Sequence, residues 1–425
     1  MIRKKIISGV LAAVTILPLC ACGNTETKNE SSAQLSSFSE SSAPESSAPE
    51  SSAVKTESSV ISKPEESYLP VIPKADKAAI NDYENKYFVR KLSNDKLYYF
   101  AELYKAASQH KNSVNFIVPI SDEDLTTLMF LLNYDCPELI HLNGDYYPRY
   151  TDDSMRYVSG LKFTYCMSEQ EYKQASAQLE DYFRDLENTL SGRSDQEKEK
   201  YVYDLIFNNC EYDEQNMISG SAYGVLIKNT GRCEGLSKAF MWAMNRLSVK
   251  CICVSGQQLW STTAIYSEHS WNEIMLDGKW YNVDITVDNF KTPGSEKNPP
   301  NYGFYNVTDE YVSQSREVNN IYTSLGKPEC NSDELNYHIR NGLFLETGKA
   351  GKEEVSRILS AKMTESGIDN VSIKFESYDD YSLAKENIEE WTGEFLRQKS
   401  GEPYIYDTCY NSLSMTIVIN AYKEN

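Results

Sequence analysis

A cysteine, a histidine and an aspartate in the middle of the chain have the types and local settings that thiol chemistry requires. Cys233 lies two residues after Gly231 and begins a stretch with helical apolar spacing, which predicts a place in the first turn of a helix. Unpaired amides and the positive end of the helix dipole stabilise a thiolate at such a position. A reactive thiol also needs a base, and His269 is one of only four histidines in the chain. Asp284 lies 15 residues further on and supplies a carboxylate that could orient the base.

Two strands joined by a tight turn are the elements that would bring His269 and Asp284 together. Asp277-Gly278 between two stretches of alternating polarity is a strong signal for a β-hairpin. With these two residues as the turn, Trp271 is expected opposite Asp284, and His269 becomes a diagonal neighbour of Asp284 on the same face. Diagonal backbone positions lie about 7–8 Å apart, which an imidazole and a carboxylate can span. A register shift of one residue would put the two side chains on opposite faces.

Three short motifs contain these residues, namely CEG at 233–235, HSWN at 269–272 and KWYNVD at 279–284. In order and spacing they resemble the transglutaminase-like superfamily, whose Cys–His–Asp triad is built on a papain-like fold. A PEL motif at 137–139 and the segment SAYGVL at 221–226 are similar to extracellular bacterial members of that superfamily. The resemblance implies that Cys233 is the nucleophile, His269 the general base and acid, and Asp284 the group that orients the imidazole.

The same resemblance implies a thiol enzyme that attacks an amide carbonyl and forms a thioester. Water as the final acceptor would make it a peptidase, amidase or deamidase, and an amine acceptor would make it a transglutaminase; the triad does not distinguish them. Trp271 and Trp280 are candidates to line the substrate cleft, with plain packing as the alternative, and Tyr223 is a candidate to help hold the oxyanion. The competing hypothesis is a non-catalytic cell-surface binding or adhesion module that uses the same cleft.

No metal and no cofactor are expected. Cys251 and Cys253 face the same side of a predicted strand and could form a metal pair with His269. No further ligand stands at a recognisable spacing, so buried small apolar side chains are the favoured interpretation.

The N-terminus has the pattern of a targeting signal. Basic residues at 3–5 precede an apolar run at 6–19 that is too short to span a bilayer. The sequence LCAC at 19–22 resembles the lipobox of bacterial lipoproteins, with Cys22 as the lipidated residue. This implies that residues 1–21 are a signal peptide and that a lipid such as palmitate on Cys22 anchors the protein at the extracellular face of the cell membrane. An ordinary secretory peptide is the alternative.

A low-complexity segment follows the signal. Residues 22–77 are rich in Ser, Pro and Glu, and SSAPE at 41–45 recurs at 46–50. Such a segment buries too little apolar surface to offset the entropy of ordering it, so a disordered tether is predicted.

The helix and strand patterns of the remaining residues predict an α+β fold made of three parts. Residues 78–198 read as an N-terminal mixed helix and strand region, 199–325 as a papain/transglutaminase-like core, and 326–425 as a small C-terminal α+β unit. In the core, a helix bearing Cys233 is expected to pack on an antiparallel sheet bearing His269 and Asp284. Helices are expected at 91–107, 122–132, 168–190, 195–207, 353–363 and 382–396. Strands are expected at 157–165, 371–375 and 412–419.

Composition limits the partners. The 425 residues include 42 Lys and Arg against 62 Asp and Glu, for a formal charge of −20. This argues against a nucleic-acid partner, because phosphate binding needs clustered basic side chains. The expected partners are therefore a peptide or protein substrate and, through the lipid, the membrane. On location alone, cell-wall peptides or surface proteins are the expected substrates.

Overall fold

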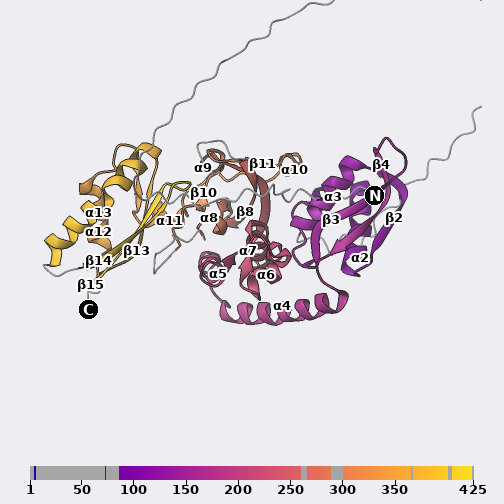
Figure 1. Ribbon diagram of the computed structural model, residues 1–425, viewed down its shortest axis with the longest axis horizontal. Coiled ribbons are helices and arrows are strands. Elements are labelled where there is room, and N and C mark those ends of the chain that lie inside the picture. The colour runs from indigo at the N-terminus through magenta and orange to yellow at the C-terminus, as the bar shows by residue number, and fades with distance from the viewer. Residues whose placement is uncertain are drawn as a thin grey trace, which may run out of the picture. The chain divides into compact units, whose positions relative to one another are not determined.

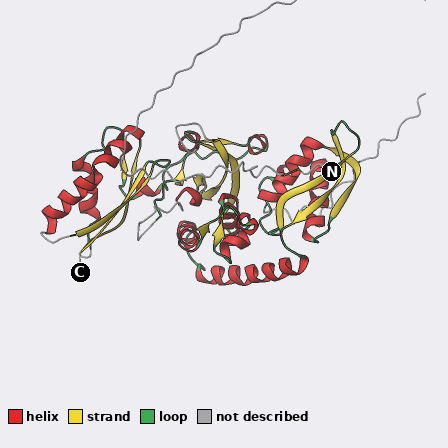
Figure 2. Cartoon of the chain, viewed as in Figure 1, coloured by secondary structure: helices red, strands yellow, loops and turns green. Residues whose placement is uncertain are grey.

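The chain forms several mostly antiparallel sheets with helices between and beside them, which is a mixed α+β architecture (Figures 1 and 2). The computed structural model describes residues 4–5, 72, 86–259, 266–288, 300–364, 367–400 and 404–423. The proposed lipidation site at Cys22, most of the signal segment and nearly all of the proposed tether lie outside the described residues.

The N-terminal region contains a four-stranded antiparallel sheet in the order β1-β3-β4-β2. Its strands are β1 (Lys4–Lys5), β2 (Ser113–Ser121), β3 (Leu142–Tyr150) and β4 (Tyr157–Tyr165). Its helices are the short η1 (Val89–Lys91), α2 (Asn94–Ser108) and α3 (Asp122–Tyr134). The sequence predicted α2, α3 and β4 but missed the other three strands, of which β1 lies in the predicted signal segment. The strands β2 and β3 each contain a proline, Pro119 or Pro148, which removes a ladder donor and weakens the strand pattern.

Two helices lead from this region to the centre of the chain, and both were predicted. They are α4 (Glu169–Thr189) and α5 (Asp195–Asn209). Each begins with a capping box, in which a serine, Ser168 or Ser194, and the glutamate three residues later satisfy each other's backbone amides. These boxes explain why the starts of both helices could be placed from sequence.

A five-stranded antiparallel sheet in the order β10-β9-β8-β7-β11 forms the centre. Its strands are β7 (Cys251–Leu259), β8 (Tyr266–Leu276), β9 (Lys279–Val283), β10 (Tyr305–Val307) and β11 (Arg316–Val318). The helix α7 (Cys233–Arg246) lies against β7 and β8. Asn272 on β8 joins the three elements, because its amide nitrogen donates to the carbonyls of Ser237 and Ile252 at 2.9 and 3.1 Å.

Short elements surround this helix and sheet. Before α7 come a two-stranded parallel pair and two short helices, namely β5 (Glu211–Tyr212), η2 (Met217–Gly220), α6 (Ala222–Leu226) and β6 (Thr230–Gly231). After β9 come the short helices α8 (Ile285–Asp288), α9 (Asp309–Ser313), α10 (Asn320–Ser324) and α11 (Tyr337–Arg340).

The predicted hairpin register is confirmed, with one difference at its end. Leu276 pairs with Lys279 and Asn272 with Val283 across the Asp277-Gly278 turn, where both φ angles are positive, at 50° and 79°. The strand β9 ends at Val283, so Asp284 leaves the ladder and does not pair with Trp271. Both faces of β8 are buried from His269 to Ile274.

The C-terminal unit is a second four-stranded sheet with two long helices. Its elements are β12 (Phe344–Leu345), α12 (Lys352–Lys362), β13 (Gly367–Phe375), α13 (Tyr378–Ser400), β14 (Tyr404–Asn411) and β15 (Thr416–Lys423). Figure 1 shows both helices beside this sheet, and they share one apolar cluster with it. The strand predicted at 412–419 was partly wrong, since 412–415 form a turn between β15 and the strand β14, which the sequence analysis missed.

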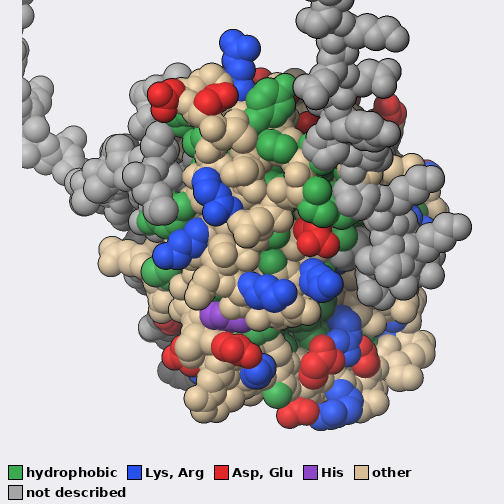
Figure 3. Space-filling view, turned by 90° about the vertical axis from the view of Figure 1, so that its right-hand side faces the viewer, with side chains coloured by type: hydrophobic (Ala, Val, Ile, Leu, Met, Phe, Trp, Pro, Cys, Tyr) green, Lys and Arg blue, Asp and Glu red, His purple; other side chains and the backbone are tan. Residues whose placement is uncertain are grey.

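The surface carries charges of both signs. Figure 3 shows one face on which Lys and Arg side chains are interspersed with Asp and Glu. Among the residues that the structure describes, no helix combines the length and apolar character that crossing a bilayer requires.

Gly235 of the CEG motif is required by packing inside α7. A methyl group at this position would overlap the backbone carbonyl oxygen of Ser219, which cannot move aside as a side chain can. We expect Gly235→Ala to lower the free energy of unfolding by about 1–3 kcal/mol through overpacking, measured by urea denaturation. The matched control is Gly393→Ala in α13, where the methyl would meet only the ends of flexible side chains. That change should leave stability unchanged or raise it by up to about 1 kcal/mol, and equal losses in both variants would contradict the prediction.

Candidate active site

Cys233 is the first residue of α7, as the sequence predicted. The preceding residue, Arg232, makes no side-chain cap, so its side chain does not occupy the amides of the first turn. The backbone of Ser270 on β8 hydrogen-bonds the thiol, and Cys233 itself is partly exposed. The start of α7 and the middle of β8 therefore meet at the sulfur atom.

The surroundings of Cys233 favour the protonated thiol over the thiolate. Burial raises the pKa of Cys233 to about 12, and the neighbouring carboxylate of Glu234 adds to the rise. Arg232 and the Ser270 hydrogen bond lower the pKa but do not outweigh these effects. The helix start alone is thus not enough to ionise this cysteine.

His269 and Asp284 form a buried hydrogen bond. The His269 Nε2 and Asp284 Oδ2 atoms are 2.7 Å apart, and each side chain is only 1% exposed. The other carboxylate oxygen, Oδ1, accepts hydrogen bonds from the amides of Thr286 and Val287 at 2.8 and 3.4 Å. Asp284 is thus held by the first amides of the segment that begins α8.

This contact assigns the proton on the imidazole. Burial alone would raise the pKa of Asp284, but His269 and Arg316 lower it to about 2, so the carboxylate is ionised and can only accept. Nε2 must therefore carry the hydrogen, and in a neutral imidazole Nδ1 is then the basic nitrogen. Burial also lowers the pKa of His269, against the pull of Asp284. Burial therefore disfavours the charged forms of both Cys233 and His269.

Arg316 on β11 contacts the triad and was missed by the sequence analysis. Its Nη2 atom lies 2.6 Å from Asp284 Oδ2, the same oxygen that accepts from His269. The contact is a short ion pair between two buried side chains. No local pattern marks Arg316, because its relation to the triad exists only after β11 pairs with β7.

Glu234 beside the nucleophile is the centre of a second buried network. Its carboxylate contacts Lys238 Nζ at 2.6 Å and Arg232 Nη2 at 3.0 Å. Burial opposes ionisation, but Lys238 and Arg232 lower the pKa of Glu234 to about 2. Asn133 of α3 donates to the same carboxylate at 2.7 Å, so the N-terminal region is fixed to the helix of the nucleophile. The spacing of Glu234 and Lys238, four residues apart on a helix, was the available sequence signal for this pair.

A protein-family model matches the part of the chain that contains this site. Residues 184–285 match the transglutaminase-like superfamily. The matched segment contains all three predicted triad residues.

Two solved structures show limited similarity to the chain. One is a proposed cysteine protease from Cytophaga hutchinsonii, with 23% identity over 21% of this chain and 30% of that one, and a TM-score of 0.19. The other is described as a TGase, with 14% identity over 44% of this chain and 52% of that one, and a TM-score of 0.24. The chain therefore spans about half of the second protein and less than a third of the first. No curated protein matches the chain.

The other predicted residues of the transglutaminase-like domain lie in different settings. Trp271 is fully buried, with its ring stacked on that of His269 at 6.2 Å and its indole N–H donating to Asn282 at 3.0 Å. Trp280 is partly buried and packs on Tyr87 at 5.6 Å. The Tyr223 hydroxyl donates to Gln178 of α4 at 2.6 Å. Substrate-binding roles for Trp271, Trp280 and Tyr223 stay predictions.

One grouping with metal-ligand chemistry occurs in the described part of the chain, and a lysine lies within it. Ligand atoms of Glu273, Asp309 and Cys330 lie within 4.8 Å of one another. Lys327 Nζ contacts Glu273 at 2.8 Å and Asp309 at 3.1 Å, which makes the group a compensated ion cluster. Cys251 and Cys253 are buried free thiols.

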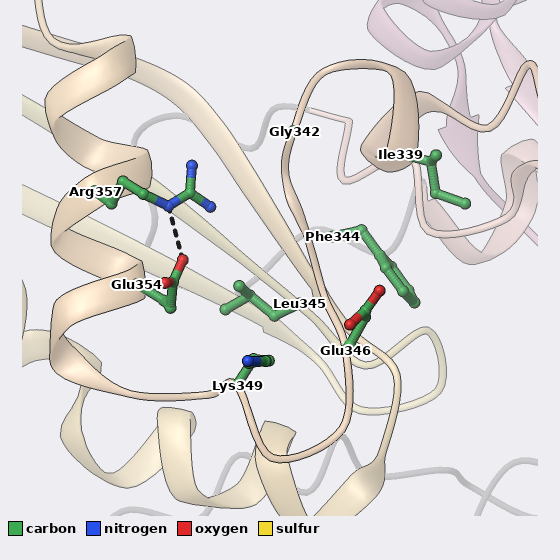
Figure 4. A pocket seen from close by; sticks show the side chains of 8 residues that line it. All are labelled: Ile339, Gly342, Phe344, Leu345, Glu346, Lys349, Glu354 and Arg357. Carbon is green, nitrogen blue, oxygen red and sulfur yellow. Dashed lines mark hydrogen bonds and ion pairs between the residues drawn. The ribbon is translucent and has the colours of Figure 1, made fainter.

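A cavity of about 300 Å³ lies in the C-terminal unit, between the start of α12 and the loop around β12 (Figure 4). Its lining mixes apolar side chains such as Phe344 with charged ones such as Lys349, and Arg357 is paired with Glu354 at 2.7 Å. None of the triad residues lines this cavity.

The lowered pKa of Asp284 predicts a specific loss of stability in acid. Its folded pKa of about 2 lies below the ordinary 3.8, so the ionised form stabilises the fold above about pH 4. That contribution, about 2 kcal/mol, should disappear as the pH falls from 4 through 2. Urea unfolding from pH 2 to 6 should show this dependence in the wild type and in Cys233→Ala, which retains the buried pair. Asp284→Asn should lose this contribution and keep the one that Glu234 makes through its own lowered pKa. An equal acid dependence in all three proteins would contradict the assignment.

The raised pKa of Cys233 predicts how its alkylation depends on pH. Labelling by iodoacetamide should rise steadily from pH 7 to 10, because the raised pKa keeps the thiolate scarce at neutral pH. Peptide mass spectrometry would follow Cys233 separately from the other thiols. A plateau of fast labelling between pH 6 and 7 that His269→Gln abolishes would instead demonstrate a stored thiolate–imidazolium pair.

Proposed function

We propose that the protein is a membrane-anchored extracellular thiol enzyme that acts on amide bonds through a thioester at Cys233. The observation that carries this proposal is the buried contact of His269 with Asp284 at 2.7 Å, beside a cysteine at a helix start. Such a contact orients a base and stabilises its protonated form, which an inert core histidine does not need. The superfamily match over 184–285 supports the same chemistry.

The first half-reaction forms the thioester. As the Cys233 sulfur attacks the amide carbonyl carbon, its proton passes to His269 Nδ1 and the carbonyl oxygen becomes an oxyanion. Backbone amides in the first turn of α7 are the candidate donors to that oxyanion. The intermediate collapses by breaking the C–N bond, and the proton on Nδ1 passes to the departing amine. Asp284 stabilises the imidazolium between the two proton transfers.

The second half-reaction decides whether the enzyme is a hydrolase or a transferase. Water or a primary amine gives a proton to Nδ1 and attacks the thioester carbon. The C–S bond then breaks and the proton returns to sulfur. Both acceptors satisfy the same triad chemistry. We propose peptide or protein donors at the cell surface, such as cell-wall peptides, on the strength of the proposed location.

Trapping the acyl-enzyme tests this function. Wild-type protein is incubated with wall-derived peptides or glutamine-containing peptides, with and without a fluorescent primary amine. We expect intact-mass analysis to show an acyl group on Cys233 and either the hydrolysed peptide or the amine conjugate. Cys233→Ala should lose both signals, whereas the matched control Cys409→Ala should keep them. Equal outcomes for wild type and Cys233→Ala would favour the binding or adhesion module.

The proposed membrane anchor has a separate test at the two N-terminal cysteines. In cells fed a palmitate analogue, the wild type and Cys20→Ala should incorporate the label and fractionate with membranes. Cys22→Ala should lose the label, because only Cys22 has the lipobox spacing, with Ala at −1 and Leu at −3. Labelling that persists in Cys22→Ala would contradict the assignment to Cys22, and a wild type without label would favour an ordinary secretory signal.

A further inference from the structure

We propose that Arg316 is a positioning residue that holds Asp284 in place and offsets its charge, so that less of that charge is left to stabilise a protonated His269. The inference rests on the proposed function for its relevance to catalysis. Its geometry and its test concern the resting protein alone.

The guanidinium and the imidazole share one oxygen atom of Asp284. Arg316 Nη2 and His269 Nε2 lie 2.6 and 2.7 Å from Oδ2, while Oδ1 is occupied by the amides that begin α8. The charge of the carboxylate is therefore divided between an arginine, which is always a cation, and a histidine, which can become one. The closer the arginine holds Oδ2, the less of that negative charge stabilises an imidazolium.

A hydrogen bond and two aromatic rings hold the Arg316 side chain in place. Its Nε donates to Gln258 Oε1 at 2.5 Å, and Gln258 in turn donates to the Leu259 and Ser315 carbonyls at 2.9 and 3.0 Å. The guanidinium lies over the rings of Phe304 and Trp271, at 4.1 and 5.0 Å from their centroids. Cation–π contacts of this kind favour a planar guanidinium over an ammonium.

A glycine on β7 lets β11 come close enough to deliver this side chain. β11 pairs with β7 so that Arg316 is opposite Gln258 and Val318 is opposite Gly256. A methyl group at Gly256 would overlap the backbone oxygen of Glu317. The strand that carries Arg316 can therefore lie at this distance only because residue 256 has no side chain.

The hydrogen bonding of Arg316 is incomplete, which argues against a purely structural role. Its side chain is fully buried, yet Nη1 has no hydrogen-bond partner among the described residues. Burying an incompletely satisfied charge costs free energy that an apolar side chain of similar size would avoid. What an apolar side chain could not supply is the positive charge beside Asp284.

The charged and titratable groups around the triad define the field that Arg316 changes. His269 is influenced by Asp284 and Arg316. Further titratable groups interact electrostatically with Asp284 or Arg316, namely Cys233, Asp288 of α8, Tyr203 of α5 and Tyr311 of α9. Glu234 and Arg232 act on Cys233. Arg316 is the cation in direct contact with Asp284, and it lowers the pKa of His269.

The test is the pH midpoint of Cys233 alkylation in Arg316→Gln. Without the arginine, Asp284 stabilises the imidazolium fully, so the thiol proton should pass to His269 at lower pH. We expect the midpoint of iodoacetamide labelling to fall by about one pH unit or more. Arg316→Lys keeps the charge and should keep the wild-type midpoint. Arg246→Gln, which removes an arginine paired with Glu180 and Glu187 on the surface, should also leave it unchanged.

The outcomes separate charge from simple support of the fold. A wild-type midpoint in a folded Arg316→Gln would overturn the proposal, as would equal shifts in Arg316→Gln and Arg316→Lys. If Arg316→Gln does not fold, Arg316→Met takes its place, because an apolar side chain of similar length removes the same charge without leaving a buried polar group unpaired. The proposal then requires a lower midpoint in Arg316→Met, and a wild-type midpoint would overturn it. A midpoint shift without any acyl-enzyme would support this inference while contradicting the proposed function.

Discussion

The hydrogen bond between His269 and Asp284 is the contact on which the arrangement of the central sheet depends. It requires His269 on the middle strand β8, where both faces are covered, and Asp284 just past the end of β9. Because β9 ends at Val283, the carboxylate is released from the ladder and meets the amides at the start of α8. An aspartate inside the strand would have no such amides to hold its second oxygen.

Local sequence signals were sufficient to locate these residues. The Asp277-Gly278 turn has the positive φ angles that its two residue types favour, and that turn determines the register of His269 relative to Asp284. The start of α7 at Cys233 follows from apolar spacing over a few turns. Each of these features depends on residues within about one element of each other, which is the range that a single sequence encodes directly.

Contacts between distant segments could not be predicted in the same way. Arg316 reaches Asp284 through the pairing of β11 with β7, and Asn133 reaches Glu234 across 101 residues. Neither residue stands in a local pattern. The opposing influences on the Cys233 thiol could not be predicted for a related reason, because helix position was visible in the sequence whereas burial and the Glu234 carboxylate were not. The strands β2, β3 and β14 are likewise defined by their neighbours in the sheet.

A resting thiol beside a neutral imidazole is physically consistent with a buried site. An ion pair of thiolate and imidazolium in this position would add two charges to a region that already holds Asp284 and Arg316, at a considerable desolvation cost. A neutral pair avoids that cost until an amide carbonyl is present to accept the negative charge. The thiolate is also the form that oxidants attack, so a protonated cysteine is protected between turnovers. In a protein proposed to act outside the membrane, where oxidants are not removed by the cytosol, the buried network around Asp284 would therefore preserve the nucleophile as well as activate it.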